Sequence, residues 1–244
     1  MAKREHQYVC SNCGAMTSAW SGRCSVCGEW NTLEQQPTVE TMAGAKTGRS
    51  LATQSLSRSL ADDVQRITTE SSEVDTVLGG GLVPGSVTLI AGQPGIGKST
   101  LLMQLAQDVA RSHSVLYVSA EESAHQVAGR AARIGSKDSS LKLATSSSTD
   151  DIAATISSGD YKLAIVDSVQ MIAAGSVTSA AGSVSQITMS TQLLTLAAKQ
   201  SNTALVIVGH VTKEGSIAGP KVLEHVVDVV LQLEGDRYGG FKVL

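Results

Sequence analysis

The segment 92–99, with the sequence GQPGIGKS, has the residue types and the spacing of a phosphate-binding loop. Glycines let such a loop curl so that several backbone N–H groups point at one anion, and the helix that follows adds its partial positive charge. Lys98 is expected to reach the β- and γ-phosphates of a nucleotide, and Ser99 to supply a hydroxyl ligand to Mg²⁺. The motif therefore predicts a site for Mg-ATP, formed by Gly92, Gln93, Pro94, Gly95, Ile96, Gly97, Lys98, Ser99 and Thr100.

Acidic residues near the ends of two other apolar runs could complete this site. Asp167 closes the run LAIVD and, at the carboxyl edge of a parallel sheet, would hold Mg²⁺ through water. Glu121 and Glu122 come shortly after the run VLYVS, and ATP hydrolysis needs a group that activates the attacking water. We expect Glu121 to be this base, with Glu122 as the alternative. A second interpretation is that both residues only favour the start of the next helix.

His210 ends a further apolar run, ALVIVG. In that position its ring could sense the γ-phosphate and pass the signal to the loop 212–220. A histidine whose ring is satisfied by nearby backbone is an equally good interpretation of the sequence. The other histidines carry no argument for a site.

The four cysteines lie within the first 28 residues as two Cys-x-x-Cys pairs, Cys10 with Cys13 and Cys24 with Cys27. Each pair can form a tight turn whose two thiolates occupy two corners of a zinc tetrahedron. Four thiolates fill the coordination sphere, so the predicted Zn²⁺ site is structural and would provide much of the folding free energy of so short a segment. Disulfides and an iron–sulfur cluster are the alternatives.

Both tryptophans, Trp20 and Trp30, flank the second cysteine pair. Their rings could stack on nucleic acid bases, or they could be the large apolar groups that this small unit packs in its core. We favour packing, because a zinc module of this size has few other large apolar side chains.

The composition limits the classes of protein that fit. Of the 244 residues, 42% are hydrophobic and only 3% aromatic, which indicates a globular core built from aliphatic side chains. The formal net charge of −3 excludes a chain coated in positive charge, so any DNA contact must use local basic residues. No apolar run reaches the roughly 18 residues of a membrane span, and no apolar segment follows Lys3 and Arg4 as in a secretory signal. We therefore expect a cytoplasmic protein with no membrane partner.

The order of the motifs predicts three regions. Residues 1–36 form a zinc ribbon with four cysteine ligands, residues 37–63 a flexible linker rich in Thr, Ser and Ala, and residues 64–244 an ATPase domain. In the third region apolar strand-like runs alternate with helical patterns, which is typical of an α/β fold with a mostly parallel central sheet. The chain stops within a strand-like run, which indicates a C-terminally truncated form.

The elements of the large region can be placed from the same patterns. We expect strands at 87–91, 115–119, 163–167, 204–209 and 226–233, and helices at 98–111, 125–134, 149–158 and 187–200. The segment 173–185 consists mainly of Gly, Ser and Ala with little to pack, and is expected to be a mobile surface loop. Open parallel sheets bind ligands at the carboxyl ends of their strands, where the phosphate loop and the acidic residues would lie.

Several segments together resemble the bacterial RadA (Sms) family of DNA repair ATPases. They are YVCSNCGA and RCSVCGEWNTL around the cysteines, VLGGGLVPGS before the phosphate loop, and VSAEES, IVDSVQ, GSVSQ, GHVTKEG, IAGPK and LEH. This combination runs through nearly the whole chain and is far more specific than the phosphate loop alone. The resemblance implies a RecA-like P-loop ATPase that forms a homo-oligomeric ring, in the family a hexamer, around single-stranded DNA.

The resemblance also implies partners and contacts. The family processes branched recombination intermediates as a translocase or helicase, and a recombinase is a further partner. The loops 173–185 and 212–220 would face the DNA, with Lys213 and Lys221 as the expected phosphate contacts. A ring multiplies the few charges of each subunit, which reconciles DNA binding with a net acidic chain.

This chain departs from the family where it stops, at Leu244. The family motif KNRFG and the C-terminal Lon-protease-like domain are not in the sequence. Two other classes remain open. A circadian-clock-type signalling ATPase of the same fold would have a protein partner, and a binding module would use ATP as a switch with negligible turnover. The cysteine segment argues against the first, and the acidic pair Glu121 and Glu122 argues against the second.

Overall fold

The computed structural model describes residues 7–12, 15–17, 19–36, 65–135, 140–210, 221–235 and 242–244. The chain divides into two compact units, Met1–Asp63 and Val64–Leu244. The first unit holds the cysteine pairs and the second holds the phosphate loop. The predicted linker at 37–63, Cys13 and Lys213 lie outside the described residues.

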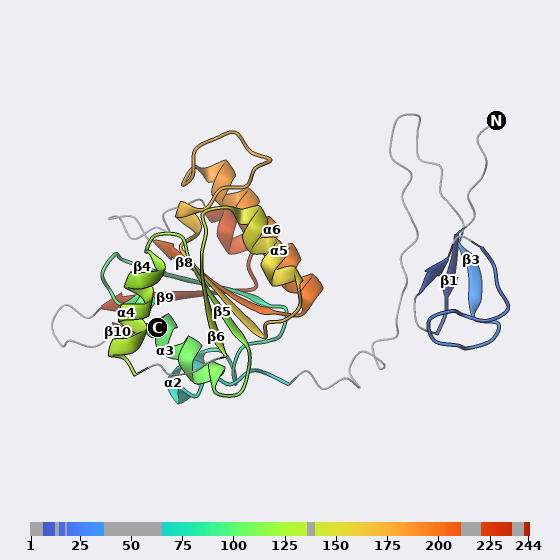
Figure 1. Ribbon diagram of the computed structural model, residues 1–244, viewed down its shortest axis with the longest axis horizontal. Coiled ribbons are helices and arrows are strands. Elements are labelled where there is room, and N and C mark those ends of the chain that lie inside the picture. Colours follow the sequence, from blue (N-terminus) through green and yellow to red (C-terminus); the bar gives the residue numbers. More distant parts are fainter. Residues whose placement is uncertain are drawn as a thin grey trace. The chain divides into compact units, whose positions relative to one another are not determined.

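The small unit contains a three-stranded antiparallel sheet in the order β2-β1-β3 (Figure 1). Its strands are β1 (Gln7–Cys10), β2 (Met16–Thr17) and β3 (Leu33–Gln36). The last residue of β1, Cys10, pairs with Leu33 at the start of β3. Together with Cys24 these two residues form the small buried core, so the thiols themselves provide much of the buried surface.

Neither tryptophan belongs to this core. Trp20 is 60% exposed and Trp30 is 67% exposed. The guanidinium carbon of Arg23 lies 5.8 Å from the ring centroid of Trp30, within the range of a cation–π contact. The expectation that both tryptophans pack in the core is wrong, because the thiols and Leu33 already fill it.

The large unit is built on a seven-stranded sheet in the order β10-β9-β4-β8-β7-β5-β6. Its strands are β4 (Val87–Gly92), β5 (Val115–Ser119), β6 (Leu141–Thr145), β7 (Leu163–Asp167), β8 (Ala204–His210), β9 (Val229–Gly235) and β10 (Lys242–Val243). The six strands from β9 to β6 are parallel, and only β10 runs antiparallel to its neighbour. The predicted mostly parallel sheet is confirmed.

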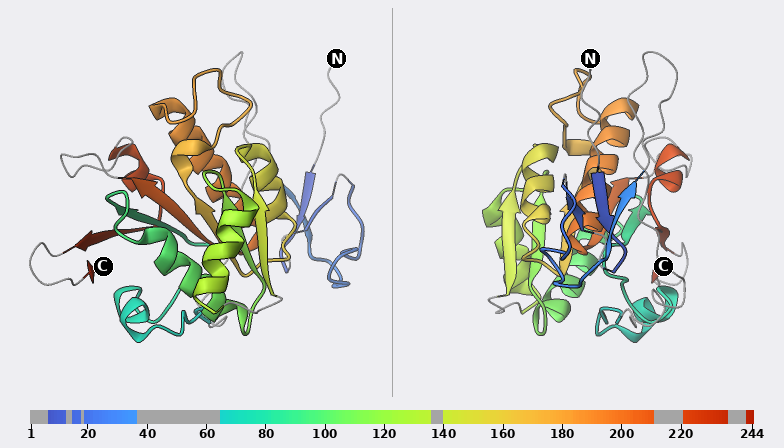
Figure 2. Two further views of the ribbon diagram at one scale, coloured as in Figure 1. Left: turned by 60° about the vertical axis from the view of Figure 1, so that its left-hand side comes forward. Right: turned by 90° about the vertical axis from the view of Figure 1, so that its right-hand side faces the viewer.

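Helices cover both faces of this sheet (Figure 1 and Figure 2). They are α2 (Ser72–Val77), α3 (Lys98–Ala110), α4 (Ala124–Arg133), α5 (Thr149–Ser157) and α6 (Val184–Ser201), with the short 3-10 helices η1 (Val169–Met171) and η2 (Lys221–His225). One core joins α2, α3 and α4 to the sheet and includes Ile165, whereas a second core joins α5 and α6 to it and includes Val166. Alternate residues of a buried strand therefore face opposite layers. No helix within the described residues is long and apolar enough to span a membrane.

Most of the expected elements are present, with small differences at their ends. β5 and β7 have the expected bounds, while β4 and β8 each extend one residue further. The sequence pattern does not predict α2 or β6. α2 has only six residues, too few to show a helical period, and β6 is an edge strand with no fully buried residue. β9 begins at Val229 and not at 226, because the N–H groups of Val226 and Val227 turn back to the carbonyl oxygen of Leu223 in η2.

The segment expected to have little to pack is held by the surrounding structure. α6 begins at Val184, and Ala174 is only 1% exposed. The side chain of Gln186 donates hydrogen bonds to the carbonyl oxygens of Val177 and Ser179 at 2.8 and 2.9 Å. The segment is a surface loop as expected, with Gly175, Ser176 and Thr178 exposed, but it is packed at Ala174 and hydrogen-bonded to Gln186 at Val177 and Ser179.

Candidate active site

The phosphate loop connects the end of β4 to the start of α3, as its motif requires. Gly95 and Gly97 have positive φ angles of 78° and 109°, a conformation that residues with a side chain rarely adopt. At Gly92 a Cβ atom would lie 2.7 Å from the carbonyl oxygen of Leu233, so only glycine fits there. Gly97 is the N-cap of α3, and no side chain among the described residues caps this end, so its first N–H groups are available to an anion.

Lys98 points back into the loop that it follows. Its Nζ atom donates to the carbonyl oxygens of Gly92 and Gln93 at 2.8 and 3.0 Å, and the residue is only 4% exposed. Burial lowers the pKa of Lys98, against the opposing effect of the negative charges of Asp167 and Glu121. The lysine is thus held where phosphate oxygens would enter, within the field of both carboxylates.

The register of the parallel strands brings the other candidate residues to the same edge. Gly92 of β4 is the direct partner of His210 of β8, and Ser119 of β5 is the partner of Asp167 of β7. Because these strands are neighbours in the order β4-β8-β7-β5, their carboxyl ends lie in one row. This is the edge at which open parallel sheets bind their ligands.

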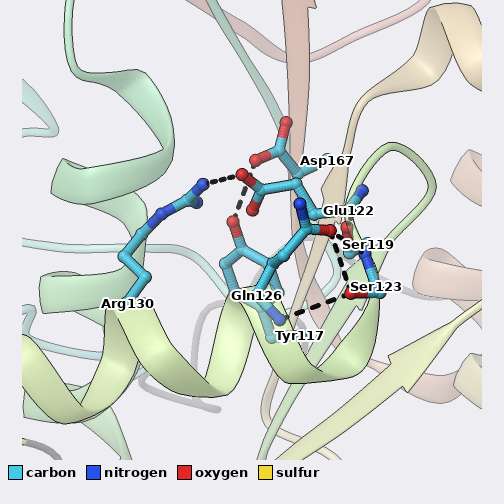
Figure 3. Close-up of polar contacts among 7 residues, drawn as sticks. All are labelled: Tyr117, Ser119, Glu122, Ser123, Gln126, Arg130 and Asp167. Carbon is cyan, nitrogen blue, oxygen red and sulfur yellow. Dashed lines mark hydrogen bonds and ion pairs between the residues drawn. The ribbon is translucent and has the colours of Figure 1, made fainter.

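Asp167 is buried, with 7% of its surface exposed, and has a specific partner. The hydroxyl of Tyr117 donates to its Oδ2 atom at 2.9 Å (Figure 3). Burial, together with the negative charge of Asp167, raises the pKa of Tyr117 well above its usual value, so the phenol remains a donor. Tyr117 was not predicted as a site residue, although a single hydroxyl-bearing ring in the apolar run VLYVS was a signal.

Glu121 receives two hydrogen bonds on one oxygen atom. Its Oε1 accepts from the hydroxyl of Ser168, and the Nε2 atom of His210 lies 3.0 Å from the same Oε1. Burial raises the pKa of Glu121, but the hydrogen bonds from His210 and Ser168 and the charge of Lys98 outweigh it and lower the pKa below its ordinary value. The carboxylate is therefore kept ionised beside the phosphate loop. Ser168 was not predicted as a site residue, although it follows Asp167 directly and belongs to the segment IVDSVQ.

Within the described residues, no backbone group is hydrogen-bonded to the ring of His210. Its Nε2 atom faces Glu121, and its Nδ1 atom is buried with no hydrogen-bond partner among the described residues. The interpretation of a ring fixed by local backbone is wrong for this part of the chain. The structure joins His210 to the acidic group that was expected to act on water.

Glu122 is directed elsewhere. Its Oε1 atom forms an ion pair with Nη2 of Arg130 on α4, and its backbone N–H donates to the hydroxyl of Ser119 at 3.0 Å (Figure 3). The side chain of Arg130 is 17% exposed and that of Glu122 35%, so the guanidinium is largely buried while the carboxylate still reaches water. Of the two adjacent glutamates, only Glu121 faces Lys98 and His210.

The alternative that both glutamates begin the next helix is wrong. α4 begins with Ser123 as its N-cap, and its first turn contains no acidic residue. Ser123 and Gln126 form a capping box, in which Ser123 N–H donates to Gln126 Oε1 at 2.9 Å and Gln126 N–H donates to Ser123 Oγ at 3.4 Å (Figure 3). Both acidic side chains are thus left for other contacts.

A cavity of about 560 Å³ opens beside the phosphate loop. Its walls include the apolar side chains of Val74, Val77, Leu101 and Leu233, and the polar side chains of Thr100 and Gln104. Apolar walls with a few polar groups and this volume are typical of small-molecule sites. The sequence carries no aromatic residue that would have marked this cavity.

The small unit brings three of the four cysteines together. The sulfur atoms of Cys10, Cys24 and Cys27 all lie within 4.8 Å of one another. The Sγ atoms of Cys10 and Cys27 are 3.7 Å apart, too far for a disulfide bond of about 2.05 Å. Tetrahedral zinc with bonds of about 2.3 Å requires sulfur atoms about 3.8 Å apart, so the described thiols fit Zn²⁺. Cys13 lies outside the described residues.

The expected DNA contacts are described only in part. Lys221 is the first residue of η2, and Lys213 lies outside the described residues. Of the two expected DNA-facing loops, 212–220 also lies outside them, whereas 173–183 is described and follows η1 directly after the active-site edge.

Comparisons with known proteins agree with both units. Residues 52–216 match the family model described as an AAA domain, and residues 8–35 match one described as a rubredoxin metal binding domain. Over the whole chain, the sequence is 45% identical to the DNA repair protein RadA of Brucella abortus and 44% identical to that of Pseudomonas aeruginosa. The chain spans 55% of the length of each of these curated relatives.

A solved structure supports the architecture of the large unit. The crystal structure of the RadB recombinase superposes with a TM-score of 0.54 at 21% identity, covering 72% of this chain and 86% of that one. At this level of identity the likeness concerns the fold alone. It agrees with a RecA-like arrangement of a parallel sheet between two helical layers.

Proposed function

This chain belongs to the RadA family of AAA-domain proteins, and from that premise we propose that it is a DNA-dependent ATPase of recombinational DNA repair. The observation that carries the ATPase part is the meeting of the phosphate-loop lysine with Asp167 and Glu121 at one edge of the sheet. DNA as the partner is taken from the names of the relatives, which are DNA repair proteins.

In this proposal each residue of the edge has one task. Lys98 exchanges the carbonyl oxygens of Gly92 and Gln93 for phosphate oxygens, which carry full negative charge and accept stronger hydrogen bonds. Mg²⁺, bound by Ser99 and through water by Asp167, would neutralise charge that develops on the phosphates. The donor set of a hydroxyl and a carboxylate suits this cation.

Glu121 is proposed as the base and His210 as its partner. A carboxylate kept ionised beside the phosphate loop can orient a water molecule and accept its proton. His210 donates to that carboxylate and limits its orientation, and it lies at the end of a strand next to the phosphate-loop strand. Glu122 is not proposed as the base, because its oxygen is paired with Arg130.

The cavity beside the loop is the proposed site of the adenosine moiety. It touches Gly97 and Thr100, which begin the helix that receives the phosphates, so a nucleotide could occupy both sites at once. The apolar side chains of Val74 and Leu101 offer faces for a planar base, and Gln104 offers hydrogen bonds.

The small unit is proposed to be a structural zinc ribbon. Cys10, Cys13, Cys24 and Cys27 would hold Zn²⁺ with four thiolates and leave no open position for catalysis. The proposed domain division is 1–36 for this ribbon, 37–63 for the linker and 64–244 for the ATPase domain.

The proposed partner is single-stranded DNA, including branched recombination intermediates. We propose a homo-oligomeric ring that acts as a translocase or helicase in the cytoplasm, alongside a recombinase. Lys213 and Lys221 would contact DNA phosphates, and the loops 173–185 and 212–220 would face the strand. With a formal net charge of −3 per chain, binding of this kind depends on repeating a few basic contacts around the ring.

The test is ATP hydrolysis by this chain with and without single-stranded DNA, with Lys98→Ala as the control. We expect DNA to increase turnover and Lys98→Ala to abolish it. Turnover that is indifferent to DNA would favour a signalling ATPase of the circadian-clock type with a protein partner. ATP binding without any turnover would favour a switch and would contradict the role of Glu121.

A further inference from the structure

Gln186 lies in the first turn of α6 and is 1% exposed, which is unusual for a glutamine. Its side chain leaves the helix and enters the preceding segment 173–183. The Oε1 atom accepts from Ala174 N–H at 2.9 Å, and Nε2 donates to the carbonyl oxygens of Val177 and Ser179 at 2.8 and 2.9 Å. A longer contact of 3.4 Å joins Nε2 to the carbonyl oxygen of Ala174. One amide group thus uses its acceptor and both donors on the same segment.

The first residues of the segment 173–183 are hydrogen-bonded to residues around the start of α5. Ala173 donates to the carbonyl oxygen of Ser147 at 2.8 Å and accepts from Thr149 N–H at 3.0 Å. The next contact comes from Asp150, whose Oδ2 atom accepts from Gly175 N–H at 2.8 Å. Residues 173–175 are therefore fixed to the start of α5. The carbonyl oxygens of Val177 and Ser179 accept from Gln186, and the hydroxyl of Ser179 is also hydrogen-bonded to those of Ser183 and Ser185 at 2.8 and 2.7 Å.

The segment is connected to the active-site edge through buried residues. Ser168, which donates to Glu121, is followed by η1, where Val169 and then Ile172 are fully buried. The far end returns to the same place, since a Cβ atom on Gly182 would lie 3.4 Å from the carbonyl oxygen of Gln170. A shift of the segment would therefore act on the element that carries Ser168.

The chemistry of the segment limits how it can bind DNA. No charged residue occurs between Asp167 and Lys199. Contacts from this segment must therefore come from backbone N–H groups and hydroxyls, which position a phosphate backbone but release few counterions. Such groups bind well only when their directions are set in advance, because a neutral donor that is free to rotate loses entropy on binding.

We propose that Gln186 is a positioning residue that presets the segment 173–183 for contact with the DNA backbone and so couples DNA binding to Glu121. This inference rests on the proposed DNA-dependent ATPase function. Gln186 itself touches neither DNA nor nucleotide. It acts by holding Val177 and Ser179 in place, on a segment whose base carries a hydrogen-bond donor to the proposed catalytic carboxylate.

The experiment compares Gln186→Leu with Gln192→Leu, an exposed glutamine on the same helix. Two quantities are measured: hydrogen exchange of the peptide that covers residues 174–179, and ATP turnover with and without single-stranded DNA. For Gln186→Leu we expect exchange to accelerate at least tenfold and the stimulation by DNA to be lost, with basal turnover within twofold of the parent. Gln192→Leu should match the parent in both. Gln186→Glu, which keeps the acceptor and loses the donors, serves as a second variant if the leucine variant does not fold.

The salt dependence of DNA affinity provides a readout that general damage to the fold would not reproduce. Gln186→Leu should weaken DNA binding by the same factor at each salt concentration, because no charge is removed. Lys221→Ala should instead reduce the salt slope by about one.

Each outcome bears on one claim. If the parent chain shows no stimulation by DNA, the proposed function fails. If the parent is stimulated and Gln186→Leu keeps that stimulation, or leaves the exchange of 174–179 unchanged, the positioning role is overturned. A loss of basal turnover in the same proportion as stimulated turnover would also overturn it, since that result indicates a general structural role.

Discussion

The Nε2 atom of His210 lies 3.0 Å from the Oε1 atom of Glu121, although the strands that carry these residues are not neighbours. β8 ends with His210, β5 comes shortly before Glu121, and β7 lies between them in the sheet. The contact thus passes over the end of β7, where Asp167 is found. The position of the proposed base therefore depends on three strands at once.

The first prediction concerns the pH dependence of turnover. Ser168 is one of two donors that lower the pKa of Glu121, and burial opposes them. Ser168→Ala removes one of the hydrogen bonds that lower the pKa of Glu121, while the effect of burial remains. The pKa of Glu121 therefore rises, and its carboxylate becomes protonated at higher pH. Because turnover requires the ionised form, we expect the acidic limb of the kcat profile to move to higher pH.

The measurement is kcat from about pH 3 to 8.5, a range that includes the ordinary Glu pKa of about 4.3 and values below it. The exposed Ser158→Ala, at the end of α5, serves as the control. The free energy of unfolding should also depend on the pKa of Glu121. A lowered pKa stabilises the native state above the ordinary carboxyl pKa, and this contribution is lost as pH falls through the native value. An acidic limb that does not move would show that the hydroxyl does not tune Glu121.

The two adjacent glutamates should behave differently. Glu121→Gln removes the base but leaves the phosphate loop intact, so we expect ATP turnover to fall by about 10²–10⁴-fold while ATP binding persists. Glu122→Gln should change turnover by only a few-fold. It should lower the free energy of unfolding by about 1–3 kcal/mol, because the shielded guanidinium of Arg130 loses its charged partner.

Turnover, nucleotide binding and urea unfolding of both variants check this prediction, with the exposed Glu224→Gln as the reference. Equal losses of turnover in the two variants would contradict the separation of their roles.

Folding of the small unit should require zinc, whereas folding of the large unit should not. Both tryptophans lie in the small unit, so their fluorescence reports on that unit alone. We expect one zinc ion per chain, and we expect a chelator to lower the fluorescence anisotropy as the ribbon unfolds, with little change in ATP turnover without DNA. Cys24→Ser should resemble the chelated protein. Retention of the parent anisotropy after complete loss of zinc would show that the thiols form a core without metal.

The cavity beside the phosphate loop offers a test of the adenosine site. Val77 lines it and is 46% exposed, so Val77→Trp can fill part of the cavity without overpacking the core. We expect the Kd for ATP to rise about tenfold, a loss of about 1.4 kcal/mol, and the Kd for inorganic tripolyphosphate to stay the same. Val230→Trp, on an exposed position of β9 outside the cavity lining, is the matched control. If ATP and tripolyphosphate weaken together, the base does not occupy this cavity.

Some parts of this protein could be predicted from short stretches of sequence. The phosphate loop depends on eight consecutive residues, and its strand, turn and helix follow from glycine conformations and apolar runs within them or next to them. The cysteine pairs likewise depend on local spacing, and the three sulfur atoms that the structure describes meet as expected. Buried strands such as β5 and β7 were found with their bounds, because aliphatic runs between polar turns have few other interpretations.

Only the tertiary structure shows which distant residues contact the same acceptor atom. Ser168 and His210 are 47 and 89 residues from Glu121, yet both reach its Oε1 atom. From the sequence, Glu121 and Glu122 were both candidates for the catalytic base. The ion pair of Glu122 with Arg130 in the folded structure leaves Glu121 as the candidate. Packing likewise placed Trp20 and Trp30 outside the ribbon core and bound Gln186 to the segment before it. The physical reason is that residue type and spacing set local backbone geometry, whereas strand order and register determine which side chains meet at a sheet edge.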